Sequence, residues 1–186
     1  MNVYDFDKTI YKKDCSIQFY LFAIKKNPQI IFKCLFKQIL AIIEYKRDKI
    51  DKKEMKKIYF CFLKYINTKE MLEEFIEKEI KNINGWYLEQ KKKDDVIISA
   101  SPEFLVKAFM GKLGITSVIA SKVDIETGEF YGENCYGEEK VVRFQKMYGM
   151  TRVEKFYTDS VSDLPMAKRA EKAYLVRNGK VGDFLL

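Results

Sequence analysis

The stretch NVYDFDKT, residues 2–9, lies close to the start of this chain of 186 residues and decides its fold. Its first half is apolar and predicts a short buried strand, which ends at two acids, Asp5 and Asp7, one residue apart. Two neighbouring carboxylates repel each other and are costly to take out of water. A hard divalent cation with oxygen ligands is the usual agent that offsets this cost. The stretch therefore predicts a strand whose carboxyl end carries a candidate cation site.

The composition narrows the chemistry in which these acids can take part. The chain has no histidine, which excludes a Ser-His-Asp triad, a Cys-His pair and His-ligated zinc. The four cysteines (Cys15, Cys34, Cys61 and Cys135) form no CxxC motif, so buried free thiols are expected in place of a metal or redox site. Catalysis would have to use carboxylates, hydroxyls, lysines, thiols or a metal ion.

No targeting or membrane-spanning segment is predicted. The N-terminus enters a strand almost at once, which argues against a signal peptide. The apolar run 29–43 is interrupted by Lys33, Lys37 and Gln38, and is too short and too charged to cross a bilayer. Together with the expected free thiols, these features favour a cytoplasmic location.

Apolar periodicity divides the chain into a helical stretch and an alternating stretch. The helical stretch has breaks that predict four helices, over 14–26, 29–46, 51–66 and 68–92. Beyond it, strands are predicted over 95–99, 118–120, 153–158 and 173–176, helices over 102–114, 137–148 and 162–170, a hairpin over 122–135, and a tight turn at Asn178-Gly179.

This order of elements predicts an α/β fold. Strands that alternate with helices form a parallel sheet with helices on both faces, so a Rossmann-like core is expected from residues 1–13 and 94–186. The helical stretch 14–93 is too long for an ordinary crossover and should form an inserted α-helical subdomain.

Polar side chains follow several of the predicted strands. Asp5 and Asp7 follow the first strand, Ser99 ends the second, and Asp159 and Asp163 follow the strand over 153–158. Ligands of open α/β sheets bind beyond the carboxyl ends of the strands. With Lys140 from the helix over 137–148, these groups can hold a divalent cation and an anion together, which suits phosphoryl transfer.

In the order and placement of these motifs, the chain resembles the haloacid dehalogenase superfamily phosphatases. It is most similar to the branch that contains phosphoserine phosphatase, in which a helical cap follows the first strand. Asp5-Phe6-Asp7-Lys8-Thr9 matches the DxDxT motif, Ser99 and Lys140 match the second and third motifs, and residues 158–163 match the acidic fourth motif. The resemblance spans the whole chain.

The resemblance implies a role for each matched residue. Asp5 would be the nucleophile that forms an aspartyl-phosphate, and Asp7 would be the general acid and base. Thr9 would support these acids without contacting the substrate. Mg²⁺ would be held by Asp5, Asp159 and the backbone carbonyl of Asp7. Ser99 and Lys140 would bind the substrate phosphate, and Asp163 would act from behind, through Lys140.

Two positions depart from the family pattern. Thr158 stands where relatives often have Gly, which an extended backbone would tolerate. Lys8 stands where many relatives have a small residue, and it either adds positive charge near the phosphate or points to solvent. A third position concerns the substrate. Asp14 stands where phosphoserine phosphatases have a Glu that binds the substrate amine, and it is either a substrate contact or a helix N-cap.

The implied function is a Mg²⁺-dependent phosphatase that hydrolyses a small phosphate monoester. Residues 12–66 carry 14 Lys or Arg and 5 Asp or Glu, so the positive charge of the chain lies in the cap. The cap's apolar stripes form either its own core or a peripheral contact with an anionic membrane. A phosphotransferase of the same chemistry, and a non-catalytic protein that binds a membrane or RNA through this basic cap, remain open. Because the lysines lie on all helix faces, no nucleic-acid partner is expected.

Overall fold

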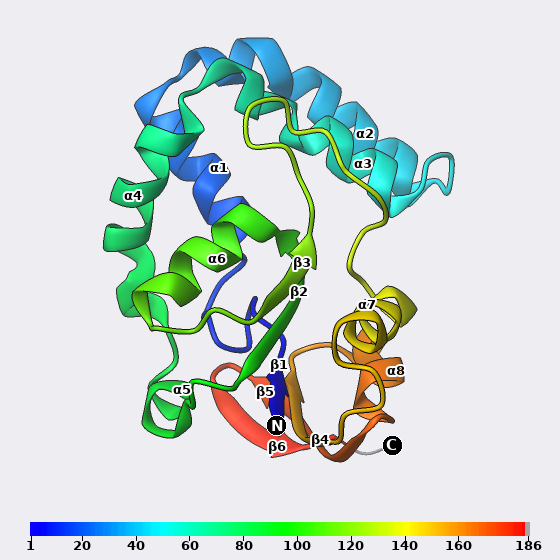
Figure 1. The fold of residues 1–186 in the computed structure, drawn as a ribbon. Helices are drawn as coiled ribbons and strands as arrows, with labels where there is room; N and C mark the ends of the chain where they lie inside the picture. Colours follow the sequence, from blue (N-terminus) through cyan, green and yellow to red (C-terminus); the bar gives the residue numbers. More distant parts are fainter. Residues whose placement is uncertain (185–186) are drawn as a thin grey trace.

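A computed structural model describes residues 1–184 of the chain (Figure 1). The strands are β1 (Asn2–Tyr4), β2 (Val96–Pro102), β3 (Val118–Ser121), β4 (Val153–Thr158), β5 (Ala170–Arg177) and β6 (Lys180–Asp183). The α-helices are α1 (Cys15–Lys26), α2 (Phe36–Lys46), α3 (Lys52–Tyr59), α4 (Thr68–Glu79), α5 (Gly85–Gln90), α6 (Glu103–Lys112), α7 (Glu138–Tyr148) and α8 (Leu164–Ala167). Shorter helical turns are η1 (Ile31–Leu35, a π-helix), η2 (Phe60–Tyr65), η3 (Ile80–Asn82) and η4 (Val161–Asp163).

The six strands form one sheet in the order β3-β2-β1-β4-β5-β6. All neighbours are parallel except β5 and β6, which pair antiparallel across the turn at Asn178-Gly179. Asn178 and Gly179 both have a positive φ, as a tight hairpin turn requires. The α/β class and the Rossmann-like sheet are therefore confirmed, with one antiparallel strand at the edge.

Side chains of opposite parity in the strands supply two separate apolar layers. Tyr4 and Ile97 belong to the larger layer, which includes α1, α4, α5 and α6. Val3 and Ile98 belong to the smaller layer, under α7 and α8. Because successive side chains of a strand point to opposite faces, one strand of three residues feeds both layers. Helices accordingly cover both faces of the sheet (Figure 1).

Of the helices between β1 and β2, α1, α2 and α3 lie over the carboxyl ends of the strands, whereas α4 and α5 run down one side of the molecule (Figure 1). Phe19 of α1 is fully buried and packs on Phe75 of α4, with the ring centroids 5.1 Å apart. Side chains cap the N-termini of three helices in this segment. The capping residues are Asp14 for α1, Asp51 for α3 and Asn67 for α4. Asp14 accepts a hydrogen bond from the backbone N–H of Ile17 at 3.0 Å. This acid is therefore a helix N-cap, one of the two roles expected for it.

Several predicted elements differ from the structure. The helix predicted over 68–92 is broken between α4 and α5, because residues 82–84 pair with the loop that follows β1. The hairpin predicted over 122–135 is a loop with one isolated bridge, between Val123 and Phe130. The helix predicted over 162–170 shortens to η4 and α8, since β5 already begins at Ala170.

Two further predictions concern the segment 14–93 and the cysteines. The division of the chain into a core and a cap stays a prediction, because the larger apolar layer contains residues of both parts. All four cysteines are free thiols, as expected, although Cys61 is only partly buried. Within residues 1–184, no helix has the length and the apolar character that a membrane crossing needs.

Candidate active site

The ends of three neighbouring strands form the candidate active site. β1 lies between β2 and β4, and from β1 the chain builds the sheet outward in both directions. Ligands of open α/β sheets bind where the strand order reverses in this way. A cavity of about 220 Å³ lies at this point, and it is lined by every predicted site residue except Thr9. The structure thus brings together side chains that are up to 158 positions apart in the sequence, as from Asp5 to Asp163.

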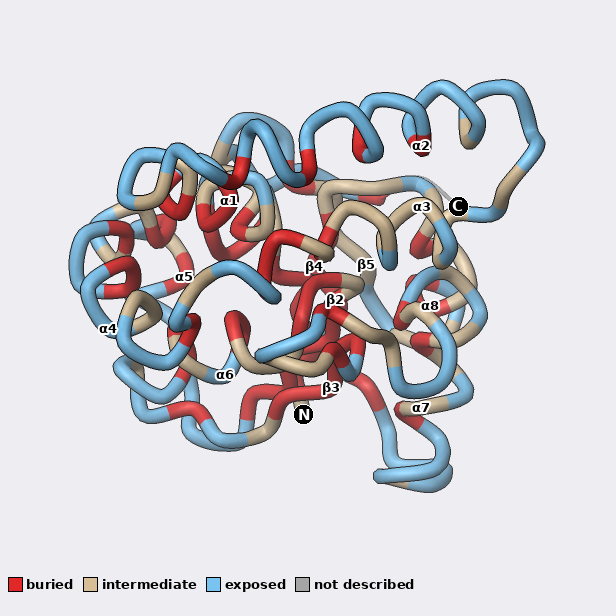
Figure 2. Tube along the Cα trace, turned by 90° about the horizontal axis from the view of Figure 1, so that it is seen from above, coloured by how far each residue is buried: buried red, intermediate tan, exposed pale blue. Residues whose placement is uncertain are grey.

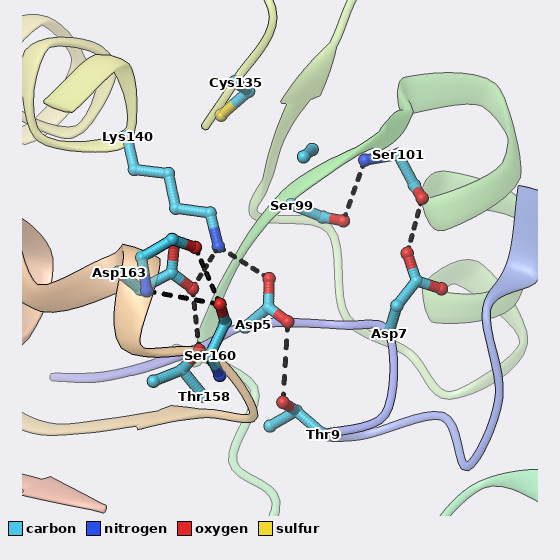
Figure 3. Close-up of polar contacts among 12 residues, drawn as sticks. Asp5, Asp7, Thr9, Ser99, Ser101, Cys135, Lys140, Thr158, Ser160 and Asp163 are labelled. Atoms are coloured by element: carbon cyan, nitrogen blue, oxygen red, sulfur yellow. Dashed lines mark hydrogen bonds and ion pairs between the residues drawn. The ribbon is translucent and has the colours of Figure 1, made fainter. Parts of the chain in front are cut away.

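Lys140 lies at the centre of the polar contacts (Figure 3). Its side chain is 2% exposed, and its Nζ donates to Asp5 Oδ1 at 2.6 Å and to Asp163 Oδ2 at 2.7 Å. Burial alone would lower the pKa of Lys140, but the charges of Asp5 and Asp163 raise it above its usual value. The ammonium group therefore stays charged and links the first and the fourth motif.

Asp5 is held by its backbone as well as by Lys140. Its backbone N–H donates to Tyr157 O at 2.8 Å, which continues the pairing of β1 with β4. Thr9 Oγ1 lies 3.5 Å from Asp5 Oδ2, so Thr9 supports the carboxylate from below the cavity. Burial raises the pKa of Asp5 to about 7, although the charge of Lys140 opposes the shift. A cation at this carboxylate would lower that pKa again.

Asp7 has a different environment from Asp5, two residues away. Its carboxylate accepts hydrogen bonds from the backbone N–H of Cys15 at 2.7 Å and from Ser101 Oγ at 2.5 Å. Burial, together with repulsion by Asp14, raises the pKa of Asp7 to about 6. A carboxyl group whose pKa lies near neutrality can both give and take a proton, which suits a general acid and base.

Among the acids that line the cavity, Asp159 is the one whose carboxylate has no partner in the described part of the chain. It is half-buried and lines the cavity, yet within residues 1–184 its carboxylate makes no hydrogen bond or ion pair. Its backbone carbonyl accepts from Arg177 at 2.6 Å, which fixes the loop after β4. Burial raises the pKa of Asp159, against the charge of Lys8.

Oxygen ligands of this kind fit a magnesium ion. Asp159 is an unpartnered carboxylate beside the buried Asp5, and Mg²⁺ prefers one or two carboxylates, with water and phosphate completing its shell. No group of three or more acidic, cysteine or histidine side chains in the described part of the chain could enclose a metal by itself. The residues therefore fit an open site that shares its ion with a substrate.

Thr158, which departs from the family pattern, has a clear place in the structure. It is the last residue of β4, in the extended conformation that a β-branched residue prefers. Its hydroxyl donates to Asp163 Oδ2 at 2.7 Å and accepts from the backbone N–H of Ser160 at 3.1 Å. Thr158 thus orients Asp163, which in turn contacts Lys140.

Lys8, the second departure, adopts a left-handed backbone conformation with φ 57°. Glycine takes this conformation without cost, whereas other residues are strained in it. The side chain of Lys8 is exposed and lines the cavity beside Asp159. Its charge therefore lies at the candidate cation and phosphate site.

Two residues of the site were missed from the sequence. Ser101 binds Asp7, while the predicted Ser99 is 1% exposed and its Oγ accepts the Ser101 backbone N–H at 3.1 Å. The alternation of a strand, which puts residues 99 and 101 on one face, is the signal that could have found Ser101. Lys56 of α3 donates to Ala100 O at 2.7 Å and to Asn134 Oδ1 at 3.0 Å. Burial lowers the pKa of Lys56 to about 8, and nothing in the sequence separates it from its neighbouring lysines.

Comparisons with known proteins identify a family for the chain. A profile of the haloacid dehalogenase-like hydrolases matches residues 3–168. A probable phosphatase of Mycobacterium tuberculosis is 33% identical over 92 residues, which are 45% of this chain and 32% of that protein. The protein CicA of Caulobacter vibrioides is 32% identical over 103 residues, which are 52% of this chain and 46% of that protein. Each match therefore spans less than half of the curated relative.

Solved structures show the same fold at low sequence identity. A protein of unknown function from Bordetella pertussis has a TM-score of 0.76 at 19% identity, with 93% of this chain and 87% of that chain covered. A substrate-bound phosphoserine phosphatase has a TM-score of 0.57 at 18% identity, with 92% and 82% covered. Because the family profile covers most of its length, the chain belongs to the haloacid dehalogenase-like hydrolases.

Proposed function

We propose that the protein is a Mg²⁺-dependent phosphatase that hydrolyses a small phosphate monoester through an aspartyl-phosphate intermediate. One observation carries this proposal: the Asp5 carboxylate lies in the cavity with Lys140 on one oxygen at 2.6 Å, while Asp7 lines the same cavity. Membership of the hydrolase family and the name of the mycobacterial relative, a probable phosphatase, support it.

In the first step, Asp5 attacks the phosphorus atom of the substrate. Lys140 holds Asp5 Oδ1, whereas within residues 1–184 Oδ2 has only the long contact with Thr9, so Oδ2 is the free nucleophile. The bond from Oδ2 to phosphorus forms as the bond from phosphorus to the leaving oxygen breaks. Asp7 donates its proton to that leaving oxygen, so an alcohol departs.

In the second step, Asp7 takes a proton from a water molecule that attacks the phosphorus atom. The bond from Asp5 Oδ2 to phosphorus breaks, and inorganic phosphate leaves. Ser99 assists in both steps, because its oxygen already accepts the Ser101 N–H and its own hydrogen is free to bind a phosphate oxygen. The charge of Lys140 stabilises the negative charge that the phosphoryl group carries throughout.

The ion would be held by the carboxylates of Asp5 and Asp159 and by the backbone carbonyl of Asp7. When bound, Mg²⁺ supplies positive charge that offsets the repulsion between a carboxylate and a phosphate. Asp163 and Thr9 do not reach the substrate: Asp163 positions Lys140, and Thr9 supports Asp5. The free thiols are consistent with a reducing compartment, and we propose the cytoplasm for this enzyme.

The test is the release of phosphate from p-nitrophenyl phosphate with and without Mg²⁺. We expect Mg²⁺-dependent release by the wild type and a loss of at least about a thousandfold in Asp5→Asn, because the nucleophile is removed. Asp183→Asn, an exposed acid on β6, is the matched control and should keep the full rate. Equal rates in Asp5→Asn and the wild type would overturn the proposal. Adding an alcohol separates the two outcomes of the chemistry, since a phosphorylated alcohol among the products would indicate transfer in place of hydrolysis.

A further inference from the structure

The outer surface of η1 and α2 is apolar and exposed. Phe32 is 90% exposed and Phe36 is 74% exposed, which is unusual for side chains of this size. The other exposed apolar residues of the same stretch are Ile31, Leu35, Ile39, Leu40, Ile42 and Ile43. These eight residues are called the α2 face below. Figure 2 shows α2 at the edge of the molecule, exposed along most of its length.

The inner surface of the same stretch is firmly packed. Ile30, Cys34, Gln38 and Ala41 recur at the spacing of one helical face, and all of them are buried. Gln38 adds two polar contacts, since its Nε2 donates to Tyr59 O at 2.8 Å and its Oε1 accepts from the hydroxyl of Tyr20. Because this inner side fixes the orientation of α2, the α2 face cannot turn inward to join the core.

Basic side chains outnumber acidic ones in the part of the sequence that contains the α2 face. Residues 25–53 contain nine Lys or Arg and three Asp or Glu. Lys37, Lys46 and Arg47 are exposed, and none of them has an ion-pair partner within residues 1–184. An apolar helix face bordered by unpaired basic groups is complementary to a surface that is apolar inside and negative outside.

The positive charge helps to decide whether a second copy of the chain or a lipid surface covers the α2 face. In a symmetric dimer, the α2 face of one copy would meet the same face of a second copy. The basic groups of both copies would then come together with too few acids to balance them, since residues 31–49 expose five Lys or Arg against Glu44 and Asp48, and like charges that meet in an interface are costly. An anionic lipid surface, by contrast, matches both the apolar face and its basic border.

We propose that the α2 face docks on an anionic lipid surface, with α2 lying in the plane of the headgroups. Phe32 and Phe36 enter the acyl boundary, and Lys37, Lys46 and Arg47 contact the negative headgroups. The hairpin of α2 and α3 connects this surface to the cavity, because Lys52 and Lys56 of α3 line the cavity. Docking therefore holds the proposed active site close to the lipid surface.

Vesicle binding tests the proposal without any use of catalytic activity. The full chain is mixed with vesicles of phosphatidylcholine alone, or of phosphatidylcholine with phosphatidylglycerol, and the bound fraction is measured by sedimentation. We expect binding to the anionic vesicles, and weaker binding in high salt, because salt screens the basic groups. The double substitution Phe32→Ser, Phe36→Ser should weaken binding about a hundredfold, or about tenfold for each ring.

A matched control uses an exposed apolar side chain elsewhere in the molecule. Met150, in the turn between α7 and β4, is 84% exposed, and Met150→Ser should bind vesicles as the wild type does. Circular dichroism checks that each variant is folded. Equal binding of the Phe32→Ser, Phe36→Ser variant and the wild type would overturn the proposal, as would the absence of any preference for anionic vesicles. A dimer in sedimentation velocity that this double substitution dissociates, with no vesicle binding, would assign the α2 face to a second copy of the chain.

Discussion

Replacing Lys140 with Met tests the charge balance of the site most directly. The ammonium group contacts two buried carboxylates, at 2.6 Å and 2.7 Å, and no other basic group donates to either of them within residues 1–184. Removing one partner of a buried ion pair costs about 3–5 kcal/mol, because the remaining charge stays buried and unpaired. At a urea dependence of roughly 2 kcal/mol per molar, the midpoint of unfolding should fall by about 2 M.

The loss should depend on pH in a direction that the structure fixes. The pKa of Asp5, about 7, already lies above its unfolded value, because burial outweighs the charge of Lys140. Without Lys140 this pKa rises further, so the folded variant loses stability as the pH rises from about 4, where an unfolded Asp ionises, to above 7. The difference in stability between Lys140→Met and the wild type should therefore be small near pH 4 and largest above pH 7.

Urea unfolding followed by circular dichroism, in EDTA to keep divalent ions away, measures this difference. Lys146→Met removes an exposed lysine from the same helix, α7, and should change the midpoint little. Lys140→Met should also lose phosphatase activity, whereas Lys146→Met should keep it. A stability difference that is the same at acid and alkaline pH, or below about 1 kcal/mol throughout, would refute the reasoning about buried charge.

Two further predictions concern stability. Asp95 is fully buried, its Oδ1 has no hydrogen-bond partner among the described residues, and burial raises its pKa to about 6. Asp95→Asn should therefore be more stable than the wild type above that pH, and this advantage should vanish near pH 4. A difference in urea midpoint that does not change with pH would contradict this prediction. Lys8→Gly should relieve the strain of a positive φ and raise the free energy of unfolding by up to about 1 kcal/mol. Lys8→Ala loses the charge but keeps the strain, so it should not be stabilised. Equal urea midpoints for the two variants would refute the argument from strain.

The edge of the sheet that carries the candidate site could be predicted because its signals are local. A short apolar run followed by acids identifies a strand and its carboxyl end, and the rule that ligands bind at such ends needs no tertiary information. Asp5, Ser99 and Asp159 were therefore placed on one edge from the sequence alone, and the structure brings them to one cavity. Their chemical roles remain proposals.

A tertiary contact accounts for the break in the helix that was predicted over 68–92. The apolar spacing runs on from α4 into α5, but Asn84 donates from its side chain to Thr9 O at 2.6 Å and from its backbone to Ile10 O at 2.8 Å. These hydrogen bonds tie the chain to the loop after β1 and end the helix. The apolar stripe on residues 30–43 was also compatible with a core or with a surface, since periodicity shows that a helix is apolar on one side and does not show what covers it.

The loop over residues 122–135 shows how α3 is kept above the cavity. Exposed ion pairs join the two, such as Lys53 with Glu133 at 2.6 Å, but pairs of this kind contribute at most about 1 kcal/mol each. The backbone contact at Gly128 is far more demanding, because a Cβ at this position would lie 2.3 Å from the carbonyl oxygen of Phe60.

Phe60 is 1% exposed, and a buried Phe side chain contributes about 1.5–3 kcal/mol. The buried packing of Phe60, which includes the ring of Phe130 in the loop at a centroid distance of 6.0 Å, therefore contributes more than any single exposed ion pair to fixing this loop against the helices. The same loop supplies Asn134, which accepts from Lys56 and from Ser121 Oγ. The loop that contacts α3 beside the cavity thus requires a glycine at position 128, which no motif of the candidate site contains.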